Sequence, residues 1–499
     1  MSKTLRFSIQ MAVATLISRV LGLVRDMLFA REFGSSPEYD AYLVAVLLPF
    51  FLRKIFAEGA LSSAFIPAYN KRAMKGIANG HKFANSILTV FIPVLLVLII
   101  FSVYFMPQIL DLVAPGLETG VQGLSVFLGR MIFPFILFIS MWAIYAGMLN
   151  SNDIFFTPAL SPAVHNVLVI IGIMVSPLFD PPILGPAIFF MIGGVAQWVI
   201  VVLGSRKIGF RFKPGYDKED IKDFMPVFLS SFAALSVTQI NSIVDTNVVS
   251  GLGAGSVSLL QYANRLFQLP LGVFAVSVST VALTQLSRNT KEEFKKNLAE
   301  GIERMILFVL PATIGLYLLR IDIIRLLFEG GEFGAYDTNM TSEILRGYVI
   351  GLPFYSLYSL FTRAEYAMKK PRIVFIASSI SVAMNIFLDI TLSQSMGPLG
   401  IAVATAVAGI SGFIVLLIHL SACGRLQLLK ANILEVLKSV TASAVMGVVL
   451  YLLNSRLDYS GVLALIKILV AIVVYAAVLL ILRQRDFMLI IKRLLKKWN

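Results

Sequence analysis

Apolar segments of helix length recur from one end of this 499-residue chain to the other, more than any soluble core could bury. Hydrophobic residues make up 58% of the chain and charged residues only 14%, and the mean hydropathy is +0.85. Helices satisfy their own backbone hydrogen bonds in lipid, where no water can replace them. The chain is therefore predicted to be an all-α polytopic membrane protein.

Glycine, proline and charged residues divide these segments into fourteen predicted transmembrane helices. Several are longer than the ~20 residues that one crossing requires, so they are expected to tilt or to project from the bilayer. The connections are short, and no soluble domain is expected. The predicted spans cover residues 8–33, 41–70, 83–113, 122–149, 157–178, 184–205, 219–252, 257–286, 295–328, 340–368, 372–393, 397–423, 432–454 and 460–482.

Lysine and arginine counts predict the orientation of these spans. With the N-terminus in the cytoplasm, the cytoplasmic segments contain 26 of these residues, whereas the outward connections contain only Arg456. This asymmetry satisfies the positive-inside rule, and an even number of spans returns the C-terminus to the cytoplasm. The net charge of +14 is thereby explained by topology and by attraction to anionic membrane lipids, and no nucleic-acid partner is expected.

Several charged residues lie inside the predicted spans, where a lipid-facing position would be costly. The stretch "SRVLGLVRD", Ser18 to Asp26, places two arginines and an aspartate in the first span. Arg19 and Arg53 each lie roughly 16 to 18 Å from a helix end, near the membrane midplane. Both should therefore face a protein or water-filled interior. Further charges within the spans include Arg25, Asp26, Glu58 and Arg265.

An internal repeat predicts how the spans are grouped. The segment "IFAEGALSSAFIPAYNK" aligns without gaps on "VFAVSVSTVALTQLSRN" at an offset of 218 residues. The same offset carries spans 1 and 2 onto spans 7 and 8, which predicts two six-helix lobes in the same orientation around a central cavity. The predicted parts are an N-terminal lobe at 1–205, a C-terminal lobe at 206–423, and spans 13–14 with an amphipathic cytoplasmic tail at 424–499.

Three segments resemble the signature sequences of a known family. They are "SRVLGLVRD", "YDAYLVAVLLPFFLRKIFAEGALSSAFIP" and "QYANRLFQLPLGVFAVSVST". They are similar to the MurJ (MviN) family of lipid II flippases, within the multidrug/oligosaccharidyl-lipid/polysaccharide exporter superfamily. The resemblance implies export of the undecaprenyl-pyrophosphate-linked peptidoglycan precursor by alternating access. It also implies that spans 13 and 14 form a hydrophobic groove for the lipid tail.

The resemblance further implies which residues bind the substrate. The essential cavity arginines of the family fall on Arg19, Arg25, Arg53 and Arg265, and its acidic position falls on Asp40. A guanidinium group stays charged and offers several fixed donors, which suits the capture of a pyrophosphate. Asp26, Asp40 and Glu58 would then position these arginines or offset their charge.

Other interpretations of the same residues remain open at this stage. Arg19 and Arg25 could pair with Asp26 or Glu58 only to lock helices together, and Asp40 could simply cap the second span. In spans 13 and 14, Lys467 could extend outward to the membrane surface. Generic packing against lipid would explain those two helices as well as a groove does.

The chain has no nucleotide-binding motif such as a P-loop, so another energy source is needed. Asn385 and Asp389 stand four residues apart on span 11, and Asp245 on span 7 and Thr405 on span 12 are expected at similar depth. Oxygen ligands of this kind suit a hard cation, and a buried aspartate suits a proton. A coupling site for Na⁺ or H⁺ is one interpretation, and a plain interhelical hydrogen-bond network is the other.

The absence of a reactive cluster argues against an enzyme. The chain has one cysteine, Cys423, and three histidines, His81, His165 and His419. Their spacing in the sequence is not that of metal ligands, so they are predicted to be isolated residues, and no cofactor is expected. The predicted function is a lipid II flippase of the bacterial cytoplasmic membrane, acting in cell-wall synthesis. The alternatives are a flippase for another polyprenyl-linked saccharide, a cation-coupled drug exporter of the same fold, and a membrane-embedded transferase or phosphatase.

Overall fold

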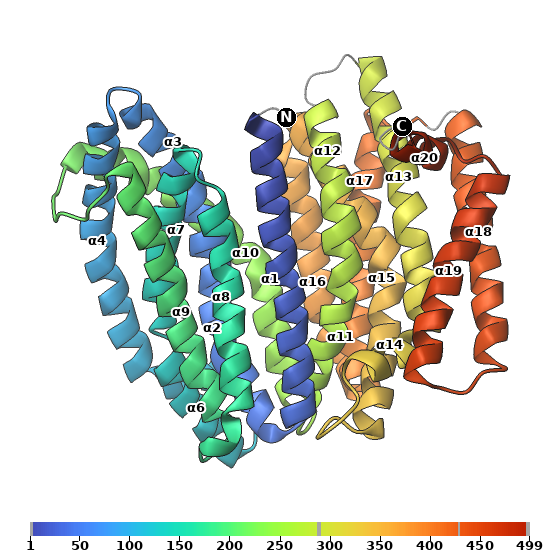
Figure 1. The fold of residues 1–499 in the computed structure, drawn as a ribbon, viewed down its shortest axis with the longest axis horizontal. Helices are drawn as coiled ribbons and strands as arrows, with labels where there is room; N and C mark the ends of the chain where they lie inside the picture. The colour runs from blue at the N-terminus through green and yellow to red at the C-terminus, as the bar shows by residue number, and fades with distance from the viewer. Residues whose placement is uncertain (1–2, 287–290, 428–429, 496–499) are drawn as a thin grey trace. The chain divides into compact units, whose positions relative to one another are not determined.

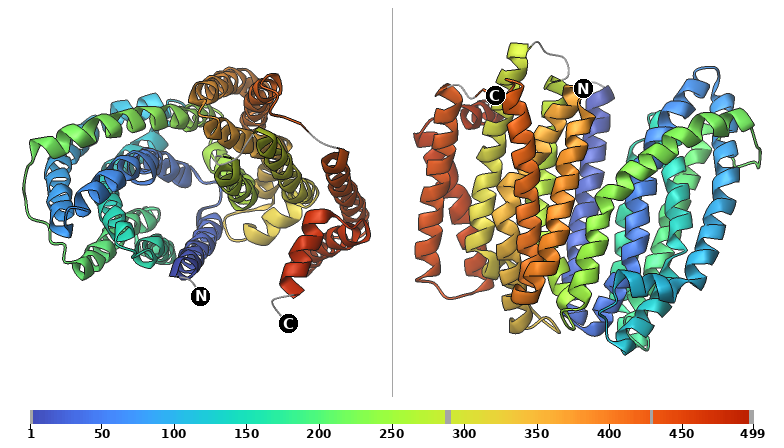
Figure 2. Two further views of the ribbon diagram at one scale, coloured as in Figure 1. Left: turned by 90° about the horizontal axis from the view of Figure 1, so that it is seen from above. Right: turned by 180° about the vertical axis from the view of Figure 1, so that it is seen from behind.

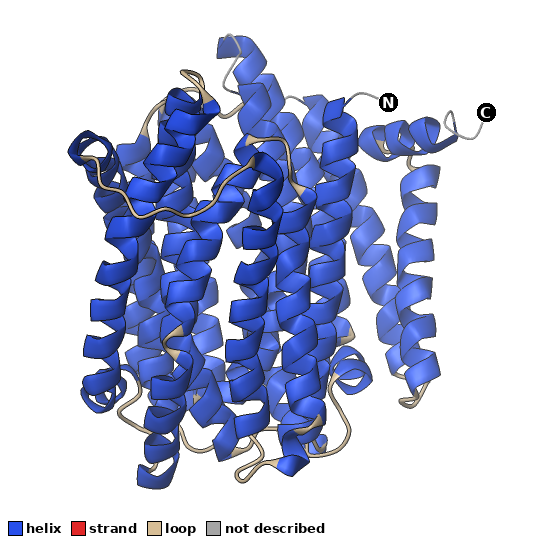
Figure 3. Ribbon diagram, turned by 60° about the vertical axis from the view of Figure 1, so that its left-hand side comes forward, coloured by secondary structure: helices blue, strands red, loops and turns tan. Residues whose placement is uncertain are grey.

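The structure, a computed structural model, describes residues 3–286, 291–427 and 430–495. Within these residues every regular element is a helix, joined to the next by short loops (Figure 3). The all-helical prediction is confirmed. The chain forms two compact units, Met1–Ser258 and Leu259–Asn499.

The first unit consists of long helices with short helical turns between them (Figure 1). Its membrane-length helices pack side by side: α1 lies along α8, and α9 lies against both α7 and α8. The elements are α1 (Lys3–Phe33), α2 (Pro37–Ile55), η1 (Phe56–Ala60), α3 (Leu61–Ala73), α4 (Ile77–Tyr104), α5 (Met106–Val113), α6 (Thr119–Ile132), α7 (Phe135–Ser151), α8 (Phe156–Met174), η2 (Ser176–Leu178), α9 (Leu184–Ser205), η3 (Arg206–Ile208) and α10 (Lys218–Ser250).

The second unit contains the remaining helices, including the additional pair α18 and α19. In it α15, α16 and α17 pack closely together, and α13 lies beside α18. The elements are α11 (Ser256–Pro270), whose first turn still belongs to the first unit, η4 (Leu271–Ala275), α12 (Val276–Leu286), α13 (Lys291–Leu318), α14 (Arg320–Leu327), α15 (Ala335–Ala367), α16 (Pro371–Met396), α17 (Pro398–Ala422), α18 (Lys430–Asn454), α19 (Gly461–Ile481) and α20 (Arg485–Leu495).

The internal repeat appears as the same local structure in both halves of the chain. A five-residue π-helix, η1, joins α2 to α3, and an equivalent π-helix, η4, joins α11 to α12. The two begin at Phe56 and Leu271, so the offset there is 215 residues rather than the 218 predicted from the alignment. Such π-bulges are uncommon and often mark functional positions. Glu58 lies in the first of them, but its side chain lies outside what the structure describes.

Ten of the described helices are long and apolar enough to cross a membrane. They correspond to predicted spans 3–6 and 9–14. The other four predicted spans correspond to α1, α2–α3, α10 and α11–α12, which carry Arg19, Arg25, Arg53, Asp245 and Arg265. The segments that contain the four candidate arginines are thus the ones in which polar and charged residues interrupt the apolar sequence most.

Two predicted spans end in a separate short helix in the structure. Residues 83–113 divide at Phe105 into α4 and the short α5, and residues 295–328 divide at Leu319 into α13 and α14. In α5, Pro107 occupies the first turn, where it needs no amide partner, and Met106, Leu110 and Val113 form one buried face. Short amphipathic helices therefore end these two spans.

The additional helices α18 and α19 are fastened to their own unit by buried polar contacts. Lys467 of α19 is 3% exposed, and its Nζ lies 2.8 Å from Oδ2 of Asp322 on α14. The expectation that Lys467 extends outward to the membrane surface is wrong, because Asp322 provides a buried partner. Tyr475 also donates to the carbonyl of Leu307 at 2.6 Å.

The amphipathic tail forms α20, which contacts α19 and is tied to α13 by ion pairs. Arg485 donates to the buried carboxylate of Glu303 at 2.8 Å, and Asp486 lies 3.3 Å from Arg304. Leu489 and Ile490 are exposed on this helix. This arrangement is typical of a helix that lies in the membrane interface.

Candidate functional site: the arginines of the first unit

Arg25 is held between α1 and α8 by three side-chain hydrogen bonds. Its Nε and Nη2 donate to Oδ1 of Asp26 at 3.1 and 2.7 Å, and its Nη1 donates to Oδ1 of Asn166 at 3.1 Å. The side chain of Arg25 is 14% exposed, and Asp26 is buried. The predicted Arg25–Asp26 pair is present, and it fixes the direction in which the guanidinium points.

Asn166 is a positioning residue that sequence reasoning missed. Its Oδ1 accepts from Arg25, and its Nδ2 donates to the backbone carbonyl of Ser18 at 3.0 Å. One side chain on α8 thereby joins two turns of α1, the helix against which α8 packs. The only sequence signal was an amide among the apolar residues of "HNVLVIIG", which by itself names no partner.

Arg53 approaches the same region from the last turn of α2. Its Cζ lies 5.9 Å from the ring centre of Phe50, and that ring packs edge-on against Phe190 at 5.6 Å. The buried imidazole of His165 packs beside Phe190, with ring centres 4.7 Å apart. Phe190 therefore lies between the ring that Arg53 approaches and the residue that precedes Asn166, the partner of Arg25.

Arg19 differs from these two arginines because its side chain is exposed on α1. Leu16 and Val20, on the same side of the helix, are also exposed, at 63% and 53%. No described residue forms an ion pair with Arg19. Of the two acidic partners considered for Arg19, Asp26 forms its ion pair with Arg25, and the side chain of Glu58 lies outside the described residues.

Asp40 binds backbone amides rather than an arginine. It is 1% exposed, and it accepts hydrogen bonds from the amide of Gly255 at 2.7 Å and from that of Ser258 at 2.8 Å. Its own helix is capped instead by Ser36, which accepts from Tyr39. Gly255 has a φ of +82°, and a Cβ there would lie 2.6 Å from the carbonyl oxygen of Ser35. Asp40 thus holds the turn that begins α11.

Arg265 lies in the second unit, on a polar side of α11. Phe267 on the opposite side stacks on Tyr348, with ring centres 5.2 Å apart. The half-buried or exposed polar residues recur at helical spacing: Gln261, Asn264, Arg265 and Gln268. Gln268 donates to Asn264 at 2.9 Å. The sequence identifies Arg265 as a candidate but assigns no role to the amides that accompany it.

The four candidate coupling residues divide between the two units. Asp245 lies in the first unit on α10, and it is half-buried. In the second unit, Asn385 and Asp389 are 1% and 0% exposed on one face of α16. Thr405 on the neighbouring α17 donates to the carbonyl of Ile401 at 3.0 Å. The structure thus confirms the shared helix face of Asn385 and Asp389.

His419 is not isolated, contrary to the prediction from its place in the sequence. Its Nδ1 lies 2.7 Å from the buried carboxylate of Glu365, and its Nε2 lies 3.6 Å from Sγ of Cys423. The partners occupy opposite sides of the ring, so one metal ion could not bind all three groups. No described group of three such side chains is arranged to hold a metal.

Comparison with known proteins agrees with this architecture. A family model described as "Lipid II flippase MurJ" matches residues 29–471. A probable lipid II flippase MurJ of Thermotoga maritima is 37% identical over 492 residues, covering 98% of each chain. The lipid II flippase MurJ of Thermosipho africanus is 38% identical over 468 residues, covering 94% of each.

Solved structures agree as well. A lipid II flippase MurJ in an inward closed conformation matches with a TM-score of 0.84 and 38% identity, over 97% of this chain and 100% of that one. An inward-facing multidrug transporter of the MATE family matches with a TM-score of 0.68 at 15% identity, over 84% of this chain and 99% of that one, which shows a shared fold only. The chain therefore belongs to the lipid II flippase MurJ family.

Proposed function

We propose that this protein moves lipid II from the inner to the outer leaflet of the bacterial cytoplasmic membrane by alternating access. The observation that carries the proposal is the Arg25 guanidinium, held in a fixed direction by Asp26 and Asn166 inside a membrane protein of the flippase family. The excess of lysine and arginine in the predicted cytoplasmic segments supports an orientation with both termini in the cytoplasm.

The hydrogen bonds of Arg25 leave part of its guanidinium available for a ligand. The group has five N–H donors, and Asp26 and Asn166 accept one from each of its three nitrogens. One N–H then remains on each terminal nitrogen and can donate to a phosphate oxygen. Arg53 adds a second positive charge nearby, which matches the charge of a pyrophosphate.

Reconstitution in liposomes tests this function against its alternatives. The full-length protein is expected to move fluorescent lipid II across the bilayer and to leave it chemically unchanged, as a transporter and not a transferase or phosphatase would. Parallel vesicles would contain another polyprenyl-diphosphate saccharide or a cationic drug. Equal or faster movement of either of those compounds would overturn the assignment of lipid II as the substrate.

We further propose that transport is coupled to Na⁺ or H⁺ through Asp245, Asn385, Asp389 and Thr405. Support comes from the buried face shared by Asn385 and Asp389, whose amide and carboxylate oxygens suit a hard cation. A bound cation would make the conformational equilibrium depend on membrane potential, at ~2.3 kcal/mol per charge per 100 mV.

The coupling proposal predicts that Asp389→Asn and Asp245→Asn each remove the response of transport to an ion gradient. Sodium and proton gradients would be varied separately in reconstituted vesicles, and Ser395→Ala, at an exposed position of α16, is the matched control. If both aspartate variants retain the gradient dependence of the parent, these residues are structural.

A further inference from the structure

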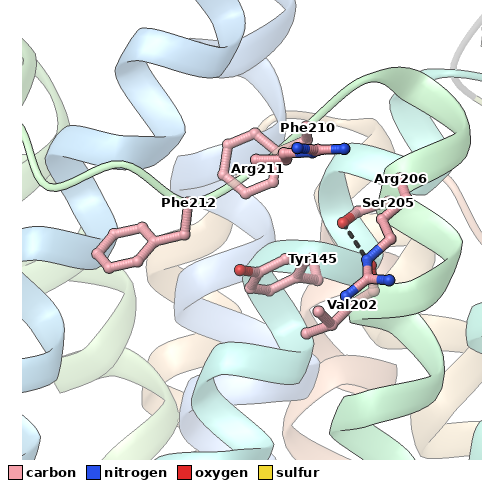
Figure 4. A pocket seen from close by; sticks show the side chains of 7 residues that line it. All are labelled: Tyr145, Val202, Ser205, Arg206, Phe210, Arg211 and Phe212. Carbon is pink, nitrogen blue, oxygen red and sulfur yellow. Dashed lines mark hydrogen bonds between the residues drawn. The ribbon is translucent and has the colours of Figure 1, made fainter.

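A second basic site lies at the end of α9, away from the arginines described above. Here α7, α9, η3 and the link that follows η3, residues 209–217, line a pocket of about 410 Å³ (Figure 4). Figure 4 shows Arg206 beside Tyr145 and Arg211 extending across the pocket from the link. The lining residues are Tyr145, Val202, Ser205, Arg206, Phe210, Arg211 and Phe212.

The two arginines of this pocket have no acidic partner among the residues that the structure describes. Other basic residues of this unit do have one: Arg72 lies 2.5 Å from Asp220, and Lys82 lies 3.3 Å from Asp217. The positive-inside rule by itself explains basic residues in this predicted cytoplasmic connection. It does not explain why two guanidinium groups line one pocket. Their unneutralised charge favours an anionic ligand.

The pocket is held in shape by the protein itself. Gly209, with a φ of +76°, ends η3 and turns the chain, and the amide of Phe210 donates to the carbonyl of Ser205 at 3.2 Å. Phe210 is 1% exposed and packs edge-on against Tyr145, with ring centres 5.5 Å apart. The pocket therefore exists without needing a ligand to form it.

The rest of the link is fastened to α4. The amide of Lys213 donates to Oδ1 of Asn85 at 3.0 Å, and that of Gly215 donates to Oγ1 of Thr89 at 3.1 Å. In the view from above, the link continues along the edge of this unit before it enters α10 (Figure 2). Arg211 and Phe212 are thus presented by a tethered segment.

We propose that this pocket binds a phosphate group, supplied by the head group of an anionic phospholipid. The apolar span Leu184–Ile208 ends at the pocket, so the pocket lies at the level where head groups meet the helix ends. Arg206 and Arg211 would hold the phosphate oxygens. Phe212, which is exposed, would contact the glycerol and the first carbons of the chains, as aromatic side chains do at membrane interfaces.

Binding to the full-length protein in detergent tests this site independently of transport. Dioctanoyl phosphatidylglycerol, dioctanoyl phosphatidylcholine and inorganic phosphate would be titrated separately by calorimetry. Phosphatidylglycerol is expected to bind, and Arg206→Gln or Arg211→Gln should each weaken it about tenfold. Lys207→Gln is the matched control, because it removes the same charge from an exposed neighbour outside the pocket.

The outcomes separate the possible sources of the phosphate. Arginine-dependent binding of phosphatidylglycerol supports the site with a lipid ligand, whereas arginine-dependent binding of inorganic phosphate alone supports it with a soluble one. Equal weakening by Lys207→Gln, or no binding of either anion, would overturn the proposal. Thermal unfolding without ligand checks that the variants are folded, which is expected since both arginines are exposed and form no ion pair with a described residue.

Discussion

Replacing Arg53 with alanine is expected to reduce lipid II flipping at least about 30-fold in reconstituted vesicles. The reason is that a charged hydrogen bond to a desolvated anion is worth roughly 2 kcal/mol or more. Arg53→Lys should restore little of the activity, since a lysine cannot reproduce the planar pair of donors. Arg265→Ala is expected to give the same loss, as the resemblance to the flippases implies for this position.

Lys54→Gln is the matched control for Arg53, because it removes a positive charge from the next residue of α2, where the side chain is exposed. It should flip lipid II at close to the parental rate. All variants should show the parental unfolding temperature in detergent, so that a loss of transport is not a loss of fold. Parental transport by both alanine variants would refute the assignment of these arginines to substrate binding.

Replacing Lys467 with methionine is expected to lower the free energy of unfolding by about 3 to 5 kcal/mol. The change leaves the carboxylate of Asp322 buried without its partner, which lies 2.8 Å away and is itself 3% exposed. Denaturation in detergent, followed by circular dichroism, would measure the loss. Lys467→Arg, which keeps the charge, should lose much less.

The double variant Lys467→Met, Asp322→Leu distinguishes the cost of an unpaired charge from the cost of altered packing. With both charges replaced by apolar side chains of similar size, most of the stability should return. If the double variant is no more stable than Lys467→Met alone, the loss of stability comes from altered packing and not from the unpaired charge.

The positions of the helices could be predicted from the sequence because of the solvent that surrounds them. A lipid-embedded backbone must form helices, so length and apolar character alone predict where they lie. Ten of the fourteen predicted spans meet that criterion directly. The breaks at Phe105 and Leu319 and the π-helix that begins at Phe56 were not predicted, because they depend on local backbone geometry that hydropathy does not record.

The candidate site was predictable in its residue types but not in its contacts. A mid-membrane arginine such as Arg53 is conspicuous because its cost in lipid is high. The predicted use of Asp40 beside arginines or as a cap of its own helix did not include its hydrogen bonds to amides 215 and 218 residues away. A carboxylate can accept hydrogen bonds from any donor that the fold places beside it, so its residue type does not identify its partner.

By itself, the sequence determined that this protein lies in a membrane, that its fold is all-helical and which family it belongs to. Tertiary structure alone decided the contacts between helices: Asn166 holds Arg25, and Asp322 neutralises Lys467. The physical reason is that hydropathy reports the free energy of placing one residue in lipid. An ion pair depends on the relative rotation of two helices, and Lys467 and Asp322 are 145 residues apart.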